Sequence, residues 1–403
     1  MSIEWEKARA CAYEAGRAAA GPVERAPLPL ADGRTLAEPL LALTDLPAFP
    51  TSSIDGWAVR GAPPWRVTGR ILAGHPASPL DEDGTCAEIA TGAMVPAGAR
   101  ALIRVEESTR DAAGLVSGVP RPIPEWRLPG EEAHRGEELL PAGTAVDPAV
   151  IGLAATCGYE SVAVRAEPRA AVLIFGDELL TTGVPGAGRV RDSLGPQVPG
   201  WLRRYGARID PGDVAGPVQD TLGAHVAAIR EALEVADLVC TTGGTMHGPV
   251  DHLHPALAAL NAEYVVNTVG VRPGFPMLLA RVPLPDGRVR FLAGLPGNPQ
   301  SAVIALITLV APLLAGLQGR EVPPLPQVTV TALVRGRGQD THLALAALDQ
   351  DRRTATPVAH VGSSMLRGLS NAHGFVIVRP DTEAAAGDQV PFLPLPLYAG
   401  ERS

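Results

Sequence analysis

The chain has 403 residues, of which 46% are hydrophobic, an ordinary share for a globular protein with a sizeable core. At about 150 residues per domain, this length predicts two to four domains. The formal net charge of −9 and the 4% share of aromatic residues argue against a nucleic-acid binder, which needs basic groups for phosphates and rings for bases.

The cysteines and the apolar segments indicate a cytoplasmic protein. Cys11, Cys86, Cys157 and Cys240 lie far apart and fit neither a zinc site nor a disulfide framework. The start of the chain carries charges where a signal peptide needs apolar residues, and the longest apolar run, Ala302–Leu317, is short for a bilayer. We therefore expect neither secretion nor insertion into a membrane.

The first 167 residues predict an extended region around a small β module. Residues 1–60 contain a helical stretch and a Pro-rich extended piece. Between residues 65 and 127, short alternating segments are broken by Gly and Pro, which is typical of a compact all-β module. An Ala-rich helix is predicted at Pro148–Cys157.

A different pattern begins at Pro168. Three continuous apolar segments, at residues 170–175, 236–242 and 291–295, predict buried strands. Residues 220–236 predict an amphipathic helix, and Ser301–Leu317 predicts an apolar one. Buried strands that alternate with helices indicate a parallel α/β sheet.

A Pro-rich linker, Glu321–Gln327, leads into a last module. Its alternating segments, at residues 327–336, 374–380 and 389–397, predict a small β barrel or sandwich. The predicted fold class is therefore multidomain α/β, with a parallel-sheet domain and separate β-rich parts.

Glycine-rich loops follow the three buried strands. They are residues 175–178, residues 241–245 with the segment up to Asp251, and residues 294–299. Ligands of open parallel sheets bind outside the carboxyl ends of the strands, and Gly-rich turns before helices present free N–H groups to anions. Each loop alone can be an ordinary strand-to-helix turn, but three in one sheet favour a binding site.

Carboxylates lie in or near the same loops, at Asp177, Glu178, Asp192 and Asp251. Acids beside a phosphate site make chemical sense when Mg²⁺ lies between the two. Taken singly, each acid can equally be a solvated loop residue or a helix N-cap. The single lysine, Lys7, excludes a Walker A phosphate loop.

Eight segments in order along the chain carry a family resemblance. SSIDGWAVRG resembles S-A-M-D-G-Y-A, IATGAMVPAGA resembles T-G-A-x-x-P-x-G-A, and RLPGEEAHRGEELLPAG resembles a G-x-D-x-x-x-G region. FGDEL resembles T-G-D-E-L, GRVRDSL resembles G-x-I-x-D-S-N, and TTGGTMHGPVD resembles G-G-x-S-x-G-x-x-D. VRPGFP is similar to K-P-G-K-P, and GLPGNPQS matches G-L-P-G-N-P-x-S. Together they resemble the molybdopterin molybdenumtransferase (molybdenum insertase) family, which includes the E domain of gephyrin.

The resemblance implies an elongated homodimer of four-part chains. Residues 1–60 and 131–167 would form a split extended and dimerisation domain, around an inserted β domain at residues 61–130. Residues 168–318 would form a molybdopterin-binding α/β domain, and residues 322–403 the C-terminal β domain.

The resemblance also implies a role in molybdenum cofactor biosynthesis. The reaction would be Mg²⁺-dependent insertion of molybdate into adenylylated molybdopterin, with release of AMP and no nucleic-acid or membrane partner. The catalytic residues would be Asp55, Thr91, Glu132, Glu178 and Asp251, and Glu178 and Asp251 would also hold the metal. The substrate-binding residues would be Gly176, Asp177, Asp192, Ser193, Gly243, Gly244, Thr245, Gly248, Arg272, Pro273, Gly274, Pro296, Gly297, Asn298, Pro299 and Ser301.

Several positions depart from the family pattern. Ile174 and Phe175 stand where the family has Ser-Thr, Leu194 where it has Asn, Met246 where it has Ser, and Phe275 where it has Lys. We expect these apolar replacements at one mouth, where each lost charge-assisted hydrogen bond weakens anion binding by about 1.5–3 kcal/mol. A milder change puts Glu132 where the family has Asp, and Arg100 also stands at an Asp position of the family.

Three functions stay open on the sequence. An ordinary insertase needs Arg272 and nearby arginines to compensate for the lost polar groups. A diverged paralogue would act on a different, less anionic nucleotide-like substrate. A non-catalytic dimeric binding or scaffold protein would have no need of the acids in the loops.

Overall fold

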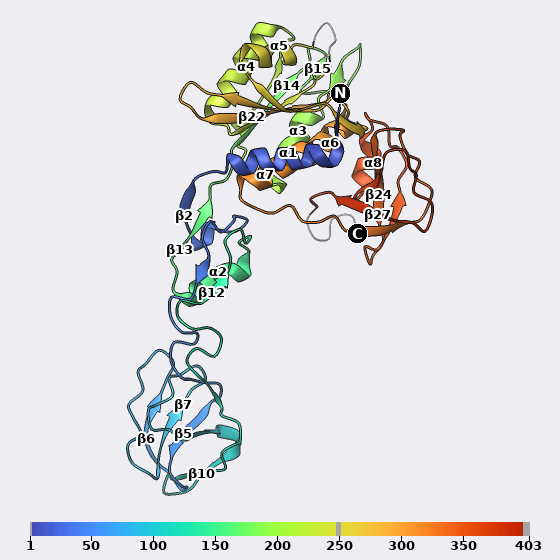
Figure 1. The fold of residues 1–403 in the computed structure, drawn as a ribbon. Coiled ribbons are helices and arrows are strands. Elements are labelled where there is room, and N and C mark those ends of the chain that lie inside the picture. Colours follow the sequence, from blue (N-terminus) through green and yellow to red (C-terminus); the bar gives the residue numbers. More distant parts are fainter. Residues whose placement is uncertain (1, 247–250, 398–403) are drawn as a thin grey trace. The chain divides into compact units, whose positions relative to one another are not determined.

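The computed structural model describes residues 2–246 and 251–397 and divides the chain into two compact units (Figure 1). Unit 1 comprises the residues up to Glu24, Gly33–Ala37 and the chain from Val164 onward. Unit 2 comprises Arg25–Asp32 and Glu38–Ala163. Strands β2 (Val23–Pro27) and β13 (Ser161–Arg165) contain residues of both units.

A six-stranded sheet forms the centre of the first part of unit 1. Its order is β17 (Val214–Val218), β14 (Ala170–Phe175), β18 (Leu238–Thr242), β22 (Val289–Leu295), β21 (Leu278–Pro283) and β19 (Glu263–Asn267). The first four strands are parallel, and β21 and β19 continue the sheet in antiparallel fashion. The three strands predicted from apolar segments are confirmed. The predicted parallel arrangement is confirmed for β17, β14, β18 and β22, whereas a tight turn at Asp286-Gly287 folds β21 back onto β22 and adds an antiparallel edge.

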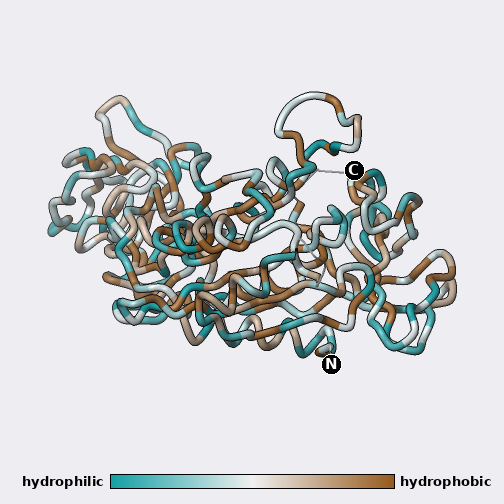
Figure 2. The backbone as a smooth tube through the Cα atoms, turned by 90° about the horizontal axis from the view of Figure 1, so that it is seen from above, coloured by the Kyte–Doolittle hydropathy of each residue, from teal (hydrophilic) through white to brown (hydrophobic). Residues whose placement is uncertain are grey.

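Helices cover both faces of this sheet, as the alternation along β14 dictates. Ala170, Val172 and Ile174 face a core shared with α1 (Trp5–Ala18), α3 (Leu194–Arg204) and the helix after β22. Ala171, Leu173 and Phe175 face a second core with α4 (Leu222–Val235) and α5 (Leu253–Ala259) (Figure 1). The backbone tube changes between hydrophobic and hydrophilic colour at short intervals along its length, as expected for elements that each bury one face (Figure 2).

The helix after β22 is one continuous element with a π-helical middle. It consists of α6 (Pro299–Ala305), a π-helical segment (Leu306–Val310) and α7 (Ala311–Leu317), and begins two residues before the predicted start. Pro312 has no N–H to bond the preceding turn, and Arg9 of α1 donates to the Ile307 carbonyl at 2.5 Å. By length and composition this helix could cross a membrane, but 89% of it is buried inside the fold, as in a core helix.

Two glycines bring α1 and α7 into close contact. A Cβ atom on Gly16 would lie 2.2 Å from the Leu313 carbonyl oxygen, and one on Gly316 would lie 2.4 Å from that of Tyr13. At the N-terminal end of α1, the Trp5 indole N–H donates to the Thr308 hydroxyl at 3.0 Å. The N-terminal helix is therefore part of the core of unit 1.

The C-terminal module of unit 1 is a five-stranded barrel, which confirms the predicted barrel or sandwich. Its strands are β23 (Gln327–Val330), β24 (Thr341–Leu348), β25 (Thr354–Pro357), β26 (Gly374–Val378) and β27 (Gln389–Pro394), with α8 (Leu366–Asn371) beside them. Pairing of β24 with both β25 and β26 closes the ring. β24 also pairs with β20 (Val269–Arg272), which pairs with β1 (Ile3–Glu4), so the barrel is joined to the α/β part.

Unit 2 contains a four-stranded sheet in the order β6 (Arg66–Ile71), β7 (Thr85–Ile89), β5 (Gly56–Arg60) and β8 (Ala101–Arg104). Because β5 pairs with both β7 and β8, the β module includes Gly56–Arg60, and the predicted boundary at residue 60 is too late. The predicted helix α2 (Pro148–Cys157) is confirmed, and Asp147 caps its N-terminus. Short strand pairs complete the unit: β3 (Leu40–Leu41) with β12 (Glu138–Leu140), β4 (Thr51–Ser52) with β11 (Trp126–Arg127), and β9 (Ser108–Arg110) with β10 (Val116–Gly118).

The α1–α7 contact yields a prediction about stability. Gly16→Ala places a methyl group against backbone, so we expect a loss of about 2–3 kcal/mol in the free energy of unfolding. The control is Gly200→Ala in α3, where a Cβ meets nothing within 4 Å and the better helix former should leave stability unchanged or raise it. Denaturant unfolding measures both, and equal effects would contradict the close packing.

Candidate functional site

Three strands of the sheet end at the same level. Ile174 of β14 is paired with Thr242 of β18, which is paired with Leu295 of β22. The loops that follow therefore begin side by side, and the Gly243 N–H donates to the Leu295 carbonyl at 2.9 Å. They line a cavity of about 720 Å³, here called the strand-end cavity, together with Asp192–Leu194, Asp220 and Asp251.

The loop after β14 depends on a glycine. Gly176 has a φ of 134°, a conformation that side chains rarely adopt, and a Cβ there would lie 2.7 Å from the Glu178 carboxylate. The chain turns at this point, with the Leu179 N–H bonded to the Gly176 carbonyl at 3.2 Å. Gly176 thus lets the Glu178 carboxylate fold back over the end of the strand, at the cavity wall.

Asp192 caps a helix at the edge of the cavity. Its carboxylate accepts the N–H groups of Leu194 at 2.9 Å and of Gly195 at 3.0 Å, the first residues of α3. A Cβ on residue 195 would lie 2.2 Å from this carboxylate, so the arrangement requires Gly195. Asp192 was predicted to bind substrate, but part of the hydrogen-bonding capacity of its carboxylate is used at the N-terminus of α3.

Asp220 connects the two acid-bearing loops. Its carboxylate accepts the Asp177 N–H at 3.2 Å, and its backbone carbonyl lies 3.1 Å from the His252 Nε2 atom. Asp177 adjoins Glu178 and His252 adjoins Asp251. Asp220 therefore holds the chain neighbours of both predicted metal ligands. Sequence reasoning missed it because β17, the strand before it, contains Gly216 and Pro217 and did not read as a buried strand.

A buried histidine packs under the cavity wall. The His225 ring is fully buried and stacks on Phe175 with 3.8 Å between ring centroids. Neither ring nitrogen has a hydrogen-bond partner among the described residues, and Nε2 lies 3.6 Å from the Asp220 carboxylate. Burial lowers the pKa of His225, an effect that the nearby Asp220 charge opposes and that His252 adds to.

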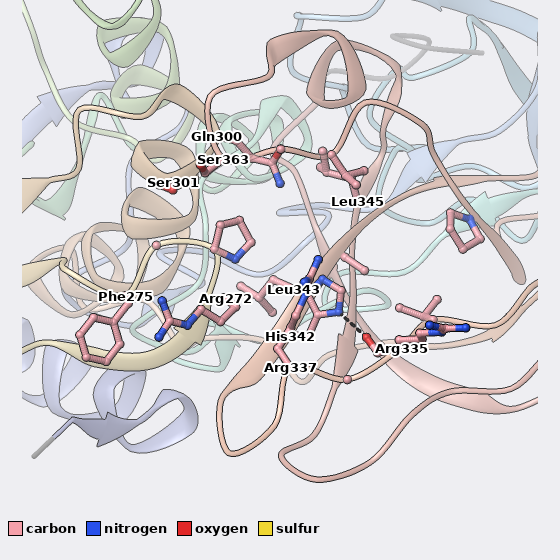
Figure 3. A pocket seen from close by; sticks show the side chains of 18 of the residues that line it. Arg272, Phe275, Gln300, Ser301, Arg335, Arg337, His342, Leu343, Leu345 and Ser363 are labelled. Carbon is pink, nitrogen blue, oxygen red and sulfur yellow. Dashed lines mark hydrogen bonds between the residues drawn. The ribbon is translucent and has the colours of Figure 1, made fainter.

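A second cavity of about 680 Å³, here called the barrel cavity, adjoins the first (Figure 3). Its lining comes from residues 272–276 after β20, from the start of α6, and from barrel residues 333–337, 342–345 and 361–363. Asn298 and Pro276 line both cavities. The terminal barrel therefore supplies one wall of the site, a contribution that the sequence did not reveal.

The barrel cavity contains arginines with different partners. Arg272 donates from Nε to the Asp340 carboxylate at 2.7 Å and lies over the Phe275 ring, 4.8 Å from its centroid. Arg335 and Arg337 are exposed, and no carboxylate of the described chain pairs with either of them. The Gln300 side chain is 1% exposed, and its Oε1 atom has no partner within the described residues.

Unit 2 contains the other predicted catalytic residues. The Asp55 carboxylate accepts the Thr91 N–H at 2.8 Å, so these two residues lie together, and both are exposed. Glu132 is also exposed, and its N–H bonds the Leu46 carbonyl at 2.8 Å. Its charge adds to the burial that raises the pKa of the Cys157 thiol.

Comparison with known proteins gives the chain a family. It matches the MoeA N-terminal region (domains I and II) over residues 3–158, a probable molybdopterin binding domain over residues 171–316, and the MoeA C-terminal region (domain IV) over residues 327–395. The chain belongs to the MoeA family.

Curated relatives in this family carry the name molybdopterin molybdenumtransferase. One from Staphylococcus aureus (strain MRSA252) is 31% identical over 311 residues, which cover 74% of this chain and 72% of the relative. One from Nostoc sp. (strain PCC 7120) is 32% identical over 302 residues, which cover 72% and 68%. The solved molybdopterin biosynthesis MoeA protein from Pyrococcus horikosii shares the fold, with a TM-score of 0.79 at 24% identity over 98% of this chain and 99% of the other.

The predicted site residues of unit 1 converge on the two cavities, with two exceptions. Eleven predicted residues line the strand-end cavity alone: Gly176, Glu178, Asp192, Ser193, Gly243, Gly244, Thr245, Asp251, Pro296, Gly297 and Pro299. Arg272, Pro273, Gly274 and Ser301 line the barrel cavity, and Asn298 lines both. Asp177 lines neither cavity and is exposed, and only its backbone N–H reaches the Asp220 carboxylate; Gly248 lies outside the described residues.

The apolar departures from the MoeA pattern do not share one mouth, which corrects the prediction. Phe175, Leu194 and Met246 line the strand-end cavity, and Phe275 lines the barrel cavity. Ile174 lines neither, because its side chain points to the opposite face of β14 and is buried in the core. The loss of polar groups is therefore divided between two places.

The acids of the strand-end cavity fit Mg²⁺ better than a transition metal. The described residues contain no group of three or more His, Cys, Asp and Glu side chains that could hold a metal by themselves. Glu178 and Asp251 offer carboxylate oxygens at the same cavity, and Mg²⁺ is typically held by one or two carboxylates together with phosphate and water oxygens.

The buried histidine yields a prediction about pH. Because the folded-state pKa of His225 lies below the ordinary 6.5, the unfolded chain takes up the proton first and stability falls as pH drops below about 6.5. His225→Leu removes this titration without removing a hydrogen bond, so its unfolding midpoint should fall less between pH 7.5 and 5.5 than that of the wild type. His75→Leu, at an exposed position, is the control. Equal pH dependence in His225→Leu and the wild type would contradict the assignment.

Proposed function

We propose that this chain is a molybdopterin molybdenumtransferase that inserts molybdate into adenylylated molybdopterin, with Mg²⁺ and release of AMP. The observation that carries the proposal is the junction of two chemically different cavities at Asn298 and Pro276. One presents glycine-rich loops and acids, as a metal-bound phosphoanhydride needs. The other presents arginines, as a small oxyanion needs.

The strand-end cavity receives the pterin phosphate and the AMP moiety. Gly243 and Gly244 have φ values of 84° and 66°, and such turns expose backbone N–H groups to an anion. The N-terminus of the long helix, at Pro299, reaches the same cavity and favours negative charge there. Ser193 and Thr245 add hydroxyl groups to this wall.

Glu178 and Asp251 hold Mg²⁺ in this proposal. When bound, the ion neutralises phosphate charge and polarises the phosphoanhydride that is cleaved. Gly176 and Asp220 keep the two carboxylates in place through the contacts described above. Without the ion, two acids beside a phosphate would repel the substrate.

The barrel cavity receives molybdate. Arg335 and Arg337 supply positive charge without a competing carboxylate among the described residues, and Gln300, Ser301 and Ser363 add polar groups. These residues can compensate for Phe275, which cannot pair with an anion. Arg272 contributes less than the sequence suggested, because Asp340 already neutralises it.

The apolar lining also favours one alternative, a diverged paralogue with a less anionic substrate. Phe175 and Met246 replace polar groups beside the predicted phosphate position, and Phe275 replaces a cation in the barrel cavity. A pure scaffold is disfavoured, since it would not need Glu178 and Asp251 at an anion cavity. Substrate turnover separates these readings.

The proposal includes a homodimer in the cytoplasm. The four cysteines are free thiols, as expected in a reducing compartment. By family resemblance, Asp55, Thr91 and Glu132 act on substrate bound by a second copy of the chain. A solution mass of twice 41.8 kDa supports this part, and a monomer that turns over substrate overturns it.

Substitution of the metal-binding acids tests the function. Loss of an outer-shell partner of a metal already lowers metal affinity or activity by about 10- to 100-fold. Asp251→Ala and Glu178→Ala remove direct ligands in this proposal, so each should lower Mg²⁺-dependent AMP release by at least about 100-fold. Both residues lie on loops, and the unfolding midpoints should stay unchanged. Glu234→Ala, on the exposed face of α4, is the matched control and should keep full turnover. Unchanged AMP release in Asp251→Ala would contradict the metal assignment.

A further inference from the structure

His342 lies in the barrel cavity beside the arginines (Figure 3). It belongs to β24 and is the register partner of Arg272 on the neighbouring parallel strand β20. Arg272 is occupied by Asp340 and Phe275, so it adds little net positive charge at this point. The imidazole therefore lies beside an arginine whose charge the Asp340 carboxylate already neutralises.

One nitrogen of this ring has a fixed partner. His342 Nδ1 lies 2.7 Å from the Arg335 backbone carbonyl, which can only accept a hydrogen bond. The Nδ1 atom therefore carries a proton whether the ring is neutral or charged. In the neutral ring Nε2 is left with a lone pair, and in the charged ring Nε2 becomes a donor.

We propose that His342 binds the oxyanion as an imidazolium, so that oxyanion binding in the barrel cavity takes up a proton and weakens as pH rises. This inference rests on the proposed molybdate role of that cavity and adds its pH dependence. A neutral Nε2 turns a lone pair toward an anion, whereas a protonated Nε2 supplies a charge-assisted hydrogen bond. His342 then supplies by protonation the charge that Phe275 lacks.

The surroundings of His342 keep the free ring neutral near pH 7. Burial lowers its pKa from the ordinary 6.5, Arg337 lowers it further, and the Arg335 carbonyl opposes both. The other charged groups near His342 are Arg335, on the same loop as Arg337, and the ion pair between Arg272 of β20 and Asp340, which directly precedes β24. The antiparallel neighbour β26 places Val378 opposite His342, which adds no charge.

The sign of the linkage follows from these states. An oxyanion favours the charged ring, so the pKa of His342 is higher in the complex than in the free protein. Between these two pKa values, affinity falls by up to about tenfold for each unit of pH increase. Above the pKa of the complex, affinity becomes independent of pH again.

Calorimetric titration with molybdate alone tests the inference. Titrations between pH 6.5 and 8.5, in pairs of buffers with different ionisation enthalpies, give both the dissociation constant and the number of protons taken up. For the wild type we expect proton uptake and a dissociation constant that rises with pH.

Three variants make the test specific. His342→Gln should show no proton uptake and no pH dependence, with affinity near that of the wild type at high pH. His342→Arg should bind molybdate tightly at every pH, again without proton uptake. His75→Gln, at an exposed position of unit 2, should behave as the wild type.

Each outcome decides a different point. Proton uptake that persists in His342→Gln, or pH-independent binding by the wild type, overturns the inference and leaves the proposed function standing. Absence of molybdate binding across the whole pH range overturns both the inference and the oxyanion role of the cavity. Proton-linked binding without AMP release supports the inference and counts against the transferase.

Discussion

The parallel register of β14, β18 and β22 is the constraint on which the site depends. Since Ile174, Thr242 and Leu295 lie at one level, the loops after them must share one edge of the sheet. Glu178, the Gly243-Gly244 turn and Pro296–Pro299 therefore surround one cavity, although they come from three loops far apart along the chain. A slip of one residue in any strand would turn its side chains to the opposite face and would separate Glu178 from Asp251.

The apolar departures have internal partners in this chain. Phe175 stacks on the buried ring of His225, and Phe275 lies under the guanidinium of Arg272. A histidine accompanies each replacement. The buried His225 lies beneath the strand-end cavity against Phe175, and His342 lines the barrel cavity together with Phe275. This member therefore differs from the family motif in which side chains carry charge, while it keeps the glycines of the motif at Gly176, Gly243, Gly244 and Gly297.

Much of this architecture could be predicted from the sequence, for physical reasons. Continuous apolar segments report burial on both faces, so β14, β18 and β22 were found, as was the barrel from its alternating pattern. β17 was missed because its Gly-Pro pair breaks the apolar run, and with it Asp220 was missed. Arg335, Arg337 and His342 carry no local signal, since only closure of the barrel and the β20–β24 pairing bring them to Arg272. The same holds for the separation of Ile174 from Phe175, which follows from the alternation of side chains along a strand.

In the proposed function, the two adjoining cavities bring a nucleotide-linked pterin and an oxyanion together through their shared wall at Asn298. The decisive experiment measures the AMP released from adenylylated molybdopterin, with Mg²⁺ present, against the molybdenum retained on the pterin. We expect equal amounts of the two products and no AMP release when molybdate is left out. AMP release at the same rate without molybdate, or none from a folded protein that binds the pterin, would contradict it.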